Sequence, residues 1–339
     1  MTTAMDGPKL TKKDFVSDQQ VRWCPGCGDY AILSSVQHAF AKLGIPRHKI
    51  VIISGIGCAA RFPYYVDCFG FHTIHGRAPA LATGLKVSRP DLSVWVVGGD
   101  GDMLSIGGNH LLHALRRNVG IKILCINNRI YGLTKGQYSP TSPVGTVKKS
   151  TPMGSIDRPV NPISLALAAE AGFVARTVDV FGPHLQETLL RAAAHEGSVF
   201  VEVLQNCLIF NDATFSNVTD RASREDNVLY LEHQKPLLFG AGGDKGIRLN
   251  GLKPEVVRVG EGGVPESELL VHDEKDESLA YLLSRMEGDG FPTPIGTFRT
   301  QEHVSYEAAA AQQVRTAREQ KGEGDLMKLI HSGDVWTVP

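Results

Sequence analysis

Two short polar segments of the chain carry residue types that could bind a metal ion together with a diphosphate group. Asp100 lies in a Gly-Asp-Gly-Asp segment that follows the apolar run 94–97, and Asn128 and Ile130 lie in an Asn-Asn-Arg-Ile-Tyr segment that follows the apolar run 121–126. A hard cation such as Mg²⁺ prefers carboxylate, amide and carbonyl oxygens, completed by water and phosphate oxygens. We therefore predict that the side chains of Asp100 and Asn128 and the carbonyl of Ile130 bind Mg²⁺ against a diphosphate.

The elements around these segments must bring them together. The runs 94–97 and 121–126 are rich in β-branched residues, which predicts buried parallel strands, and residues 104–118 have apolar side chains at helical spacing. Asp100 and Asn128 then lie just beyond the carboxyl ends of strands in one sheet, where open α/β folds bind ligands. Either segment alone would also fit an ordinary turn. Together, their spacing is typical of a thiamine-diphosphate site, in which glycines let the backbone approach the phosphates.

Cys24 and Cys27 form a Cys-Pro-Gly-Cys segment that could direct two thiolates at one metal centre. Six cysteines are too few for a disulfide framework in a chain of 339 residues, and clustered cysteines in a reducing compartment more often serve metal binding or catalysis. A thioredoxin-like redox pair is the alternative, although no strand of the thioredoxin kind precedes the segment. We favour a metal-binding pair.

Two further cysteines follow predicted strands. Cys58 comes after the apolar run 50–53, and Cys207 comes after the run 199–204, so both lie on the edge of the sheet that carries Asp100. Isolated cysteines are more often small buried hydrophobic residues, and that alternative stays open for both. Four thiolates would suit zinc or an iron–sulfur cluster. The remaining two cysteines, Cys68 and Cys125, are assigned to the core.

The composition is that of an ordinary globular enzyme subunit. Hydrophobic residues make up 42% of the chain, charged residues make up 21%, and the formal net charge is −1. This balance argues against nucleic acid or an anionic membrane as a partner. No apolar stretch approaches the roughly 20 residues of a membrane span, and residues 1–13 lack the apolar core of a signal peptide. We expect a cytoplasmic location.

Alternating strand and helix patterns predict an α/β fold with a doubly wound, mostly parallel sheet. We expect helices over 30–43, 75–88, 162–171, 183–195 and 307–319, and strands over 50–53, 94–97, 121–126, 173–180 and 199–204. Residues 240–265 are rich in glycine and charge and are expected to form an irregular connection. We divide the chain into a cofactor-binding domain over 1–239 and a C-terminal extension over 240–339, which packs on that domain or on a partner subunit.

Several motifs together resemble the β subunit of the 2-oxoacid:ferredoxin oxidoreductases, and in particular of those that act on 2-oxoglutarate. In chain order the motifs are Trp23-Cys24-Pro25-Gly26-Cys27-Gly28, Gly55-Ile56-Gly57-Cys58, His75-Gly76-Arg77-Ala78, Gly99-Asp100-Gly101-Asp102, 128–137, Ser139-Pro140-Thr141 and 271–275. They extend over almost the whole chain. The resemblance implies a fold of the thiamine-diphosphate-binding type, in the form of its diphosphate domain.

The resemblance also implies a set of ligands for each cofactor. It implies that one [4Fe–4S] cluster is held by Cys24, Cys27, Cys58 and Cys207. It agrees with Asp100, Asn128 and the Ile130 carbonyl as the ligands of Mg²⁺. Thiamine diphosphate would be lined by the matching residues Ile56, Gly57, Cys58, Ala59, His75, Gly76, Arg77, Gly101, Asp102, Gly132 and Leu133.

The chain lacks one component that thiamine chemistry requires. A carboxylate must contact the aminopyrimidine ring from a second α/β domain, and no second copy of the diphosphate motif is visible. We therefore expect that domain on an α subunit, without which this chain is inactive. The resemblance implies coenzyme A as acyl acceptor, ferredoxin as electron acceptor and an (αβ)₂ assembly.

The identity of the substrate depends on the cations beside the cofactor motifs. The two carboxylates of 2-oxoglutarate require cations close to the thiazolium ring, and Arg61 and Lys135 lie beside the cofactor motifs. His75 is a further candidate for a contact with substrate or diphosphate. Together with these residues, the resemblance implies oxidative decarboxylation of 2-oxoglutarate to succinyl-CoA and CO₂, reversible toward CO₂ fixation. The alternatives are a pyruvate or broad-specificity 2-oxoacid enzyme, a non-redox thiamine-diphosphate decarboxylase with structural zinc on four cysteines, and a scaffold subunit without catalysis.

Overall fold

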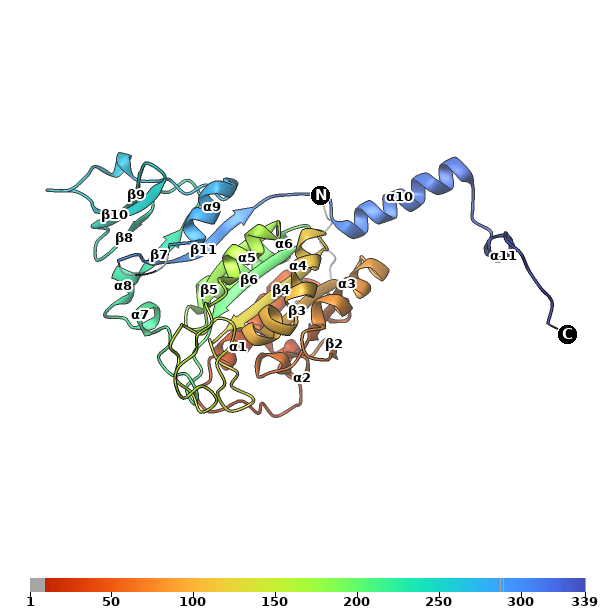
Figure 1. Cartoon of the computed structure of the whole chain (residues 1–339), viewed down its shortest axis with the longest axis horizontal. Helices are drawn as coiled ribbons and strands as arrows, with labels where there is room; N and C mark the ends of the chain where they lie inside the picture. The colour runs from red at the N-terminus through yellow and green to blue at the C-terminus, as the bar shows by residue number, and fades with distance from the viewer. Residues whose placement is uncertain (1–9, 287, 289, 339) are drawn as a thin grey trace.

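An eight-stranded sheet forms the centre of the computed structural model, which describes residues 10–286, 288 and 290–338 (Figure 1). Its strands are β1 (Ile50–Ser54), β2 (Phe69–His72), β3 (Ser93–Gly99), β4 (Ile121–Asn127), β5 (Phe173–Val178), β6 (Val199–Leu204), β7 (Val228–Leu231) and β11 (Thr293–Thr300). The strand order is β2-β1-β3-β4-β6-β5-β11-β7. All neighbouring pairs are parallel except β5 with β11. The predicted α/β class with a mostly parallel sheet is confirmed.

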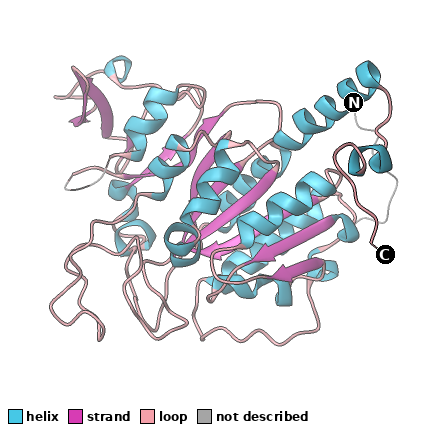
Figure 2. Ribbon diagram, turned by 45° about the vertical axis from the view of Figure 1, so that its right-hand side comes forward, coloured by secondary structure: helices cyan, strands magenta, loops and turns pink. Residues whose placement is uncertain are grey.

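Helices cover both faces of this sheet (Figure 2). One face packs against α1 (Asp29–Leu43) and α6 (Gly182–Ala194). The other packs against α3 (Ala78–Ser88), α4 (Gly108–Arg116), α5 (Pro162–Ala168) and α9 (Glu277–Ser284). The shorter helices are η1 (Lys12–Phe15), η2 (Arg47–Lys49), η3 (Ala59–Arg61), α2 (Phe62–Tyr65), α7 (Ser216–Thr219), α8 (Arg224–Asn227) and η5 (Glu266–Glu268).

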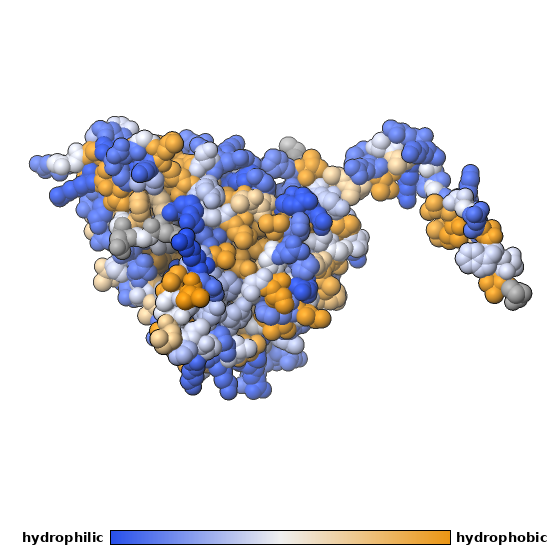
Figure 3. Space-filling model, viewed as in Figure 1, coloured by the Kyte–Doolittle hydropathy of each residue, from blue (hydrophilic) through white to orange (hydrophobic). Residues whose placement is uncertain are grey.

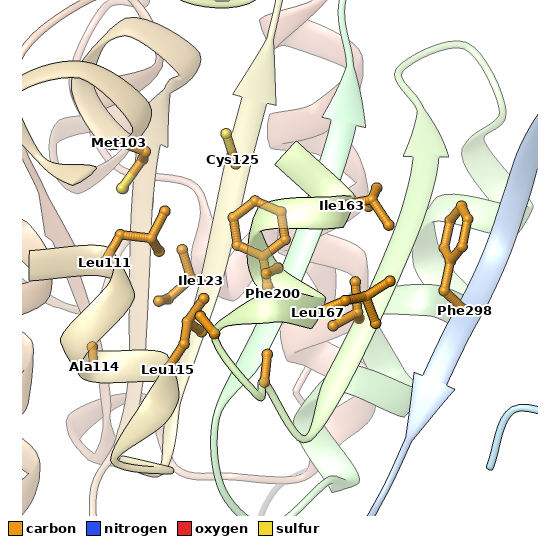
Figure 4. Close-up of a cluster of buried hydrophobic side chains, with 14 of the residues drawn as sticks. Met103, Leu111, Ala114, Leu115, Ile123, Cys125, Ile163, Leu167, Phe200 and Phe298 are labelled. Carbon is orange, nitrogen blue, oxygen red and sulfur yellow. The ribbon is translucent and has the colours of Figure 1, made fainter. Parts of the chain in front are cut away.

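Successive side chains of the central strands enter two different cores. In β4, Ile121, Ile123 and Cys125 face the core under α4 and α5, and Leu124 and Ile126 face the core under α1 and α6. Figure 4 shows the first of these cores, in which residues of α4, α5, β4, β6 and β11 meet. A strand buried on both faces needs apolar residues at nearly every position, which explains the continuous apolar runs of the sequence.

The predicted strands and helices are present, with shifted ends. The helix expected from residue 75 begins at Ala78, and the helix expected over 104–118 consists of a π-helical turn, η4 (Asp102–Ile106), followed by α4. A π-helical turn is rare and is frequently found at functional sites. Here it follows directly on the segment that contains Asp100.

The expectation of an irregular connection over 240–265 was wrong. Strands β9 (Lys245–Asn250) and β10 (Lys253–Arg258) form a small antiparallel sheet with β8 (Leu238–Phe239). Most side chains of β9 and β10 are not fully buried, so the sequence has little of the apolar alternation that marks a strand.

β11 comes from the segment that we assigned to a C-terminal extension, yet it lies inside the main sheet between β5 and β7. Its sequence contains a proline, a glycine and polar residues, so it lacks the apolar run of the other central strands. The guanidinium of Arg299 is buried and pairs with Glu170 at 2.9 Å and Glu277 at 3.0 Å. The division of the chain into two parts at residue 239 stays a prediction. In the structure, the C-terminal part contributes the strand β11 to the main sheet.

The C-terminal residues leave the body as an arm (Figure 1). The arm consists of α10 (Tyr306–Lys321) and α11 (Leu326–Ile330), and its far end exposes apolar side chains, visible in Figure 3. The base of α10 is fixed to the body because Glu307 accepts a hydrogen bond from the Gly120 amide at 3.1 Å. No helix among the described residues has the length and apolarity that crossing a membrane requires.

We expect β11 to be indispensable for folding. A chain that ends at residue 239 lacks β11, α9 and the buried ring of Phe298, so the edge of β5 and one core face are exposed. It should show no cooperative thermal unfolding by circular dichroism. A chain that ends at residue 321 removes only the end of the arm and should melt like the full chain; equal melting of both shortened chains would contradict the expectation.

Candidate functional site

The loops that follow β1, β3, β4 and β6 lie next to one another, because these four strands are consecutive in the sheet. Each loop starts at the carboxyl end of a parallel strand, so all four open onto one edge. They contain, in sheet order, Cys58, Asp100, Asn128 and Cys207. The fold therefore brings together the residues that the sequence singled out.

Asp100 is fixed by two hydroxyl groups. Its side chain is buried, and its Oδ2 accepts hydrogen bonds from the hydroxyls of Ser139 and Thr141, each at 2.5 Å. Burial raises the pKa of the carboxyl group, while these two hydrogen bonds oppose the rise. The Ser-Pro-Thr motif was visible in the sequence, but its contact with Asp100 was not.

Asn128 is held in one orientation by the buried side chain of Gln205. Nδ2 of Asn128 donates to Oε1 of Gln205 at 2.8 Å, and Oδ1 of Asn128 accepts from the Ile130 amide at 3.1 Å. Arg129 lies between them in the left-handed region, at φ 57°, and turns the chain sharply. An amide oxygen has two lone pairs, so Oδ1 can accept this hydrogen bond and still bind a cation.

The loops after β3 and β4 approach each other closely at Gly101. A Cβ atom on Gly101 would lie 2.1 Å from the ring of Tyr131, whose hydroxyl donates to the Gly101 carbonyl at 3.2 Å. Any larger residue would therefore push the two candidate Mg²⁺ segments apart. The oxygen donors and this close backbone approach fit a magnesium–diphosphate group.

Asp102 joins three segments around one carboxylate oxygen. Its Oδ1 accepts from the amides of Ile56 at 3.1 Å and Gly76 at 2.7 Å, and from Nδ1 of His75 at 2.5 Å. A carboxylate only accepts, so Nδ1 of His75 carries the proton and Nε2 is left for other contacts. Oδ2 of Asp102 is buried and has no hydrogen-bond partner among the described residues.

The three segments that contain the four candidate cysteines are neighbours in the structure. A Cβ atom on Gly132 would lie 3.4 Å from Sγ of Cys207 and 3.8 Å from Sγ of Cys58. The 24–27 segment packs on the loop of Cys207, since a Cβ on Gly26 would lie 2.6 Å from Cδ2 of Leu208. The absence of a side chain at Gly132 leaves space beside two sulfur atoms, which fits a sulfur-ligated cluster.

Three of these thiols, those of Cys27, Cys58 and Cys207, lie in surroundings that disfavour their charged form. Burial, followed by the charge of Asp29, raises the pKa of Cys58 to about 11, and burial also raises the pKa of Cys27 and Cys207. Cys24 is exposed and the other three are partly buried. As the side chains stand, no three His, Cys, Asp or Glu residues in the described part of the chain are close enough to hold a single metal ion. Of the two cysteines assigned to the core, Cys125 is fully buried and Cys68 is partly buried.

Two buried carboxyl groups beside the cysteines were not expected from the sequence. Oδ2 of Asp29 lies 3.5 Å from Sγ of Cys27, and Oδ2 of Asp179 accepts from the Asn206 amide at 3.0 Å. Burial raises the pKa of Asp29 to about 7 and also raises that of Asp179. Neither residue lies in a sequence motif that indicates a functional site.

A cavity of about 440 Å³ opens beside the loop of Cys58. Arg61 lines it, together with Arg22, His72 and the cofactor-motif residues Ile56, Gly57 and Leu133. Among the described residues, its lining contains cations and no acidic residue, which suits an anionic ligand.

Lys135, Arg77 and Ala59 are not among the residues that line this cavity. Lys135 is exposed in a turn at φ 75°, where its amide donates to the Gly132 carbonyl at 3.0 Å. The guanidinium of Arg77 donates to the Ile106 carbonyl at 3.1 Å, and Ala59 is buried. Of the three residues predicted to be catalytic, the structure places Arg61 in the cavity wall and His75 against Asp102.

Comparison with known proteins places these features in one family. Residues 55–203 match the family model of the C-terminal, thiamine-pyrophosphate-binding domain of thiamine pyrophosphate enzymes. The 2-oxoglutarate oxidoreductase subunit KorB of Mycobacterium tuberculosis is 53% identical over 331 residues, which cover 96% of this chain and 88% of the relative. Subunit beta of 2-oxoacid:ferredoxin oxidoreductase 1 of Aeropyrum pernix is 48% identical over 190 residues, covering 56% of this chain and 60% of the relative.

The similarity extends to a solved structure. A chain of the 2-oxoglutarate:ferredoxin oxidoreductase of Magnetococcus marinus, with 2-oxoglutarate, coenzyme A and succinyl-CoA bound, aligns with a TM-score of 0.77 at 34% identity. The alignment covers 98% of both chains. This chain therefore belongs to the family of 2-oxoacid:ferredoxin oxidoreductase β subunits.

Proposed function

We propose that this chain is the β subunit of a 2-oxoglutarate:ferredoxin oxidoreductase, and that Mg²⁺, thiamine diphosphate and a [4Fe–4S] cluster bind at its common loop edge. The observation that carries the proposal is the 128–133 segment. One end of it contains the candidate Mg²⁺ ligands Asn128 and Ile130, and the other end, Gly132, lies beside Cys58 and Cys207. A cofactor site and a cysteine set that share one loop are what thiamine-dependent electron transfer requires.

The reaction converts a 2-oxoacid into a thioester. The C1–C2 bond of 2-oxoglutarate breaks with release of CO₂, a thioester bond forms with coenzyme A, and two electrons and the thiol proton leave. Thiamine diphosphate, when bound, supplies the nucleophilic carbon and the electron sink for this chemistry. Two electrons must pass singly to ferredoxin, and the four cysteines would hold the cluster that accepts them.

The residues of this chain would hold and orient the reactants. Asp100, Asn128 and the Ile130 carbonyl would bind Mg²⁺ on the diphosphate, with Asp100 kept in place by its two hydroxyl donors. Asp102 fixes His75 with Nδ1 protonated, which leaves Nε2 to contact substrate or cofactor. Arg61 in the cavity wall would pair with a carboxylate of the substrate.

An α subunit would complete the active site. Beside the His75 loop, the edge strand β2 exposes Phe69 and Phe71, and Ile74 is 77% exposed. Exposed apolar residues grouped at a site edge are typical of a subunit interface. We therefore place the pyrimidine-activating domain of the α subunit there, within an (αβ)₂ assembly in the cytoplasm that reduces ferredoxin.

Metal analysis of the αβ complex tests the cluster. Anaerobically purified protein should contain about four iron atoms per β chain, and Cys207→Ser should lose iron because one ligand is gone. Cys68→Ser, which alters a cysteine outside the set, should keep it. Zinc in place of iron, with CO₂ release that needs neither coenzyme A nor an electron acceptor, would contradict the proposal and favour the non-redox enzyme.

Substrate choice is tested by removing single cations. Arg61→Gln should lower kcat/KM for 2-oxoglutarate by about tenfold to a hundredfold, the loss expected for one charge-assisted hydrogen bond. Activity on pyruvate, which has one carboxylate fewer, should fall less. Lys135→Gln, which removes the other predicted substrate cation, is measured in the same way for comparison. If neither variant changes the ratio of the two activities, 2-oxoglutarate is not selected by these residues.

The support of His75 is tested through stability. Asp102→Asn should lower the free energy of unfolding by about 1.5–3 kcal/mol, because a charged acceptor of three N–H groups is replaced by a neutral one. Chemical unfolding of the αβ complex measures this change. Asp67→Asn removes a carboxylate from an exposed ion pair with Arg47 and should cost less than about 1 kcal/mol. Equal losses of unfolding free energy in the two variants would show that the Asp102 contacts stabilise the protein no more than an exposed ion pair does.

A further inference from the structure

One side chain connects the candidate Mg²⁺ site with the candidate cluster site. Gln205 follows β6 and is 1% exposed. Its Oε1 accepts from Nδ2 of Asn128 at 2.8 Å, and its Nε2 lies 3.3 Å from Sγ of Cys27. Gln205 thus contacts one candidate ligand of each centre.

The orientation of the Gln205 amide is fixed by its partners. Nε2 has two protons, of which one can point to the Cys27 sulfur and the other to the Asn206 carbonyl, 2.6 Å away. Turning the amide over would place its NH₂ group against the NH₂ of Asn128 and its oxygen against the Asn206 carbonyl. The backbone is held as well, because the Gln205 amide donates to the Asn127 carbonyl at 2.9 Å.

We propose that Gln205 is a positioning residue for both centres: it turns the oxygen of Asn128 toward the Mg²⁺ site and donates an N–H···S hydrogen bond to the Cys27 ligand of the cluster. This inference rests on the proposed function. Neither contact could be predicted from the sequence, because Gln205 lies two positions before Cys207 and its partners are on other segments.

The contact with Asn128 acts together with the Ile130 amide, which donates to Oδ1 at 3.1 Å, to set which atom of the Asn128 side chain faces the metal. Asn128 could present either Oδ1 or Nδ2, and only the oxygen binds a hard cation. Because Gln205 takes up Nδ2 through its own oxygen, Oδ1 is the atom left for Mg²⁺. Loss of such a supporting contact typically weakens metal binding by about 10–100-fold.

The contact with Cys27 acts on the cluster instead. Reduction adds negative charge to a cluster and its thiolates, and a hydrogen-bond donor to a thiolate stabilises that charge. The Gln205 N–H therefore raises the reduction potential of the cluster. The carboxylate of Asp29, 3.5 Å from the same sulfur, acts in the opposite sense when it is charged.

Two variants separate the two contacts. Gln205→Glu keeps an oxygen acceptor for Asn128 but replaces the donor beside Cys27 with a second oxygen. Gln205→Met has similar length and neither group. Gln186→Met is the matched control, because Gln186 lies on the surface helix α6 and contacts only the Lys42 side chain among its described hydrogen-bond partners.

The experiment uses the anaerobically purified αβ complex with two readouts. Redox titration followed by electron paramagnetic resonance gives the midpoint potential of the cluster, and quenching of tryptophan fluorescence by thiamine diphosphate gives the Mg²⁺ concentration for half-saturation. Gln205→Glu should make the potential more negative and leave the Mg²⁺ requirement near that of the unaltered protein. Gln205→Met should shift the potential in the same direction and raise the Mg²⁺ requirement by about 10–100-fold.

Other results would overturn the inference. Unshifted potentials in both variants would exclude the Cys27 contact, and an unchanged Mg²⁺ requirement in Gln205→Met would exclude the role at Asn128. Loss of iron from both variants, but not from Gln186→Met, would replace positioning with a requirement for cluster assembly. Absence of a cluster signal in the unaltered complex would instead refute the proposed function, so the two failures are distinguishable.

Discussion

The order of the strands in the sheet is the constraint on which the candidate site depends. β1, β3, β4 and β6 are consecutive and parallel, so the loops at their carboxyl ends must share one edge. That order is maintained by two cores, one on each face, which receive alternate side chains of the same strands. The polar loops can therefore vary in shape without changing which loop lies beside which. A separation of the loops would require breaking the sheet itself.

The loops at this edge can approach one another closely because two of their residues are glycines, which have no side chain. Gly101 allows the ring of Tyr131 to reach across from the neighbouring loop, and Gly132 leaves space beside Cys58 and Cys207. These contacts make the segment after β4 common to the candidate diphosphate site and the candidate cysteine set. The two centres are therefore parts of one structure, and a change in the backbone at either would be transmitted to the other through a few residues.

Much of this arrangement could be predicted from the sequence, and the remainder could not for physical reasons. Runs such as 121–126 identify strands because burial on both faces demands apolar residues throughout. β11 was not predicted because it contains Arg299, a charged residue that is unusual in a buried strand. The charge is neutralised by glutamates that are distant in the sequence. Gln205 escaped for a similar reason, since its importance comes from partners on other loops. Cys58 and Cys207 were candidates from their place after two strands, but local sequence also allowed buried hydrophobic residues there, and the shared cluster was implied by resemblance to a family.

The place of β11 in the sheet also affects the order of events during synthesis. β5 and β7 are complete by residue 231, but the strand that lies between them spans 293–300. Contacts between such distant segments form slowly, and an open strand edge can meanwhile pair with another chain. A nascent chain whose translation stalls before residue 293 therefore leaves the β5 edge open to pairing with another chain.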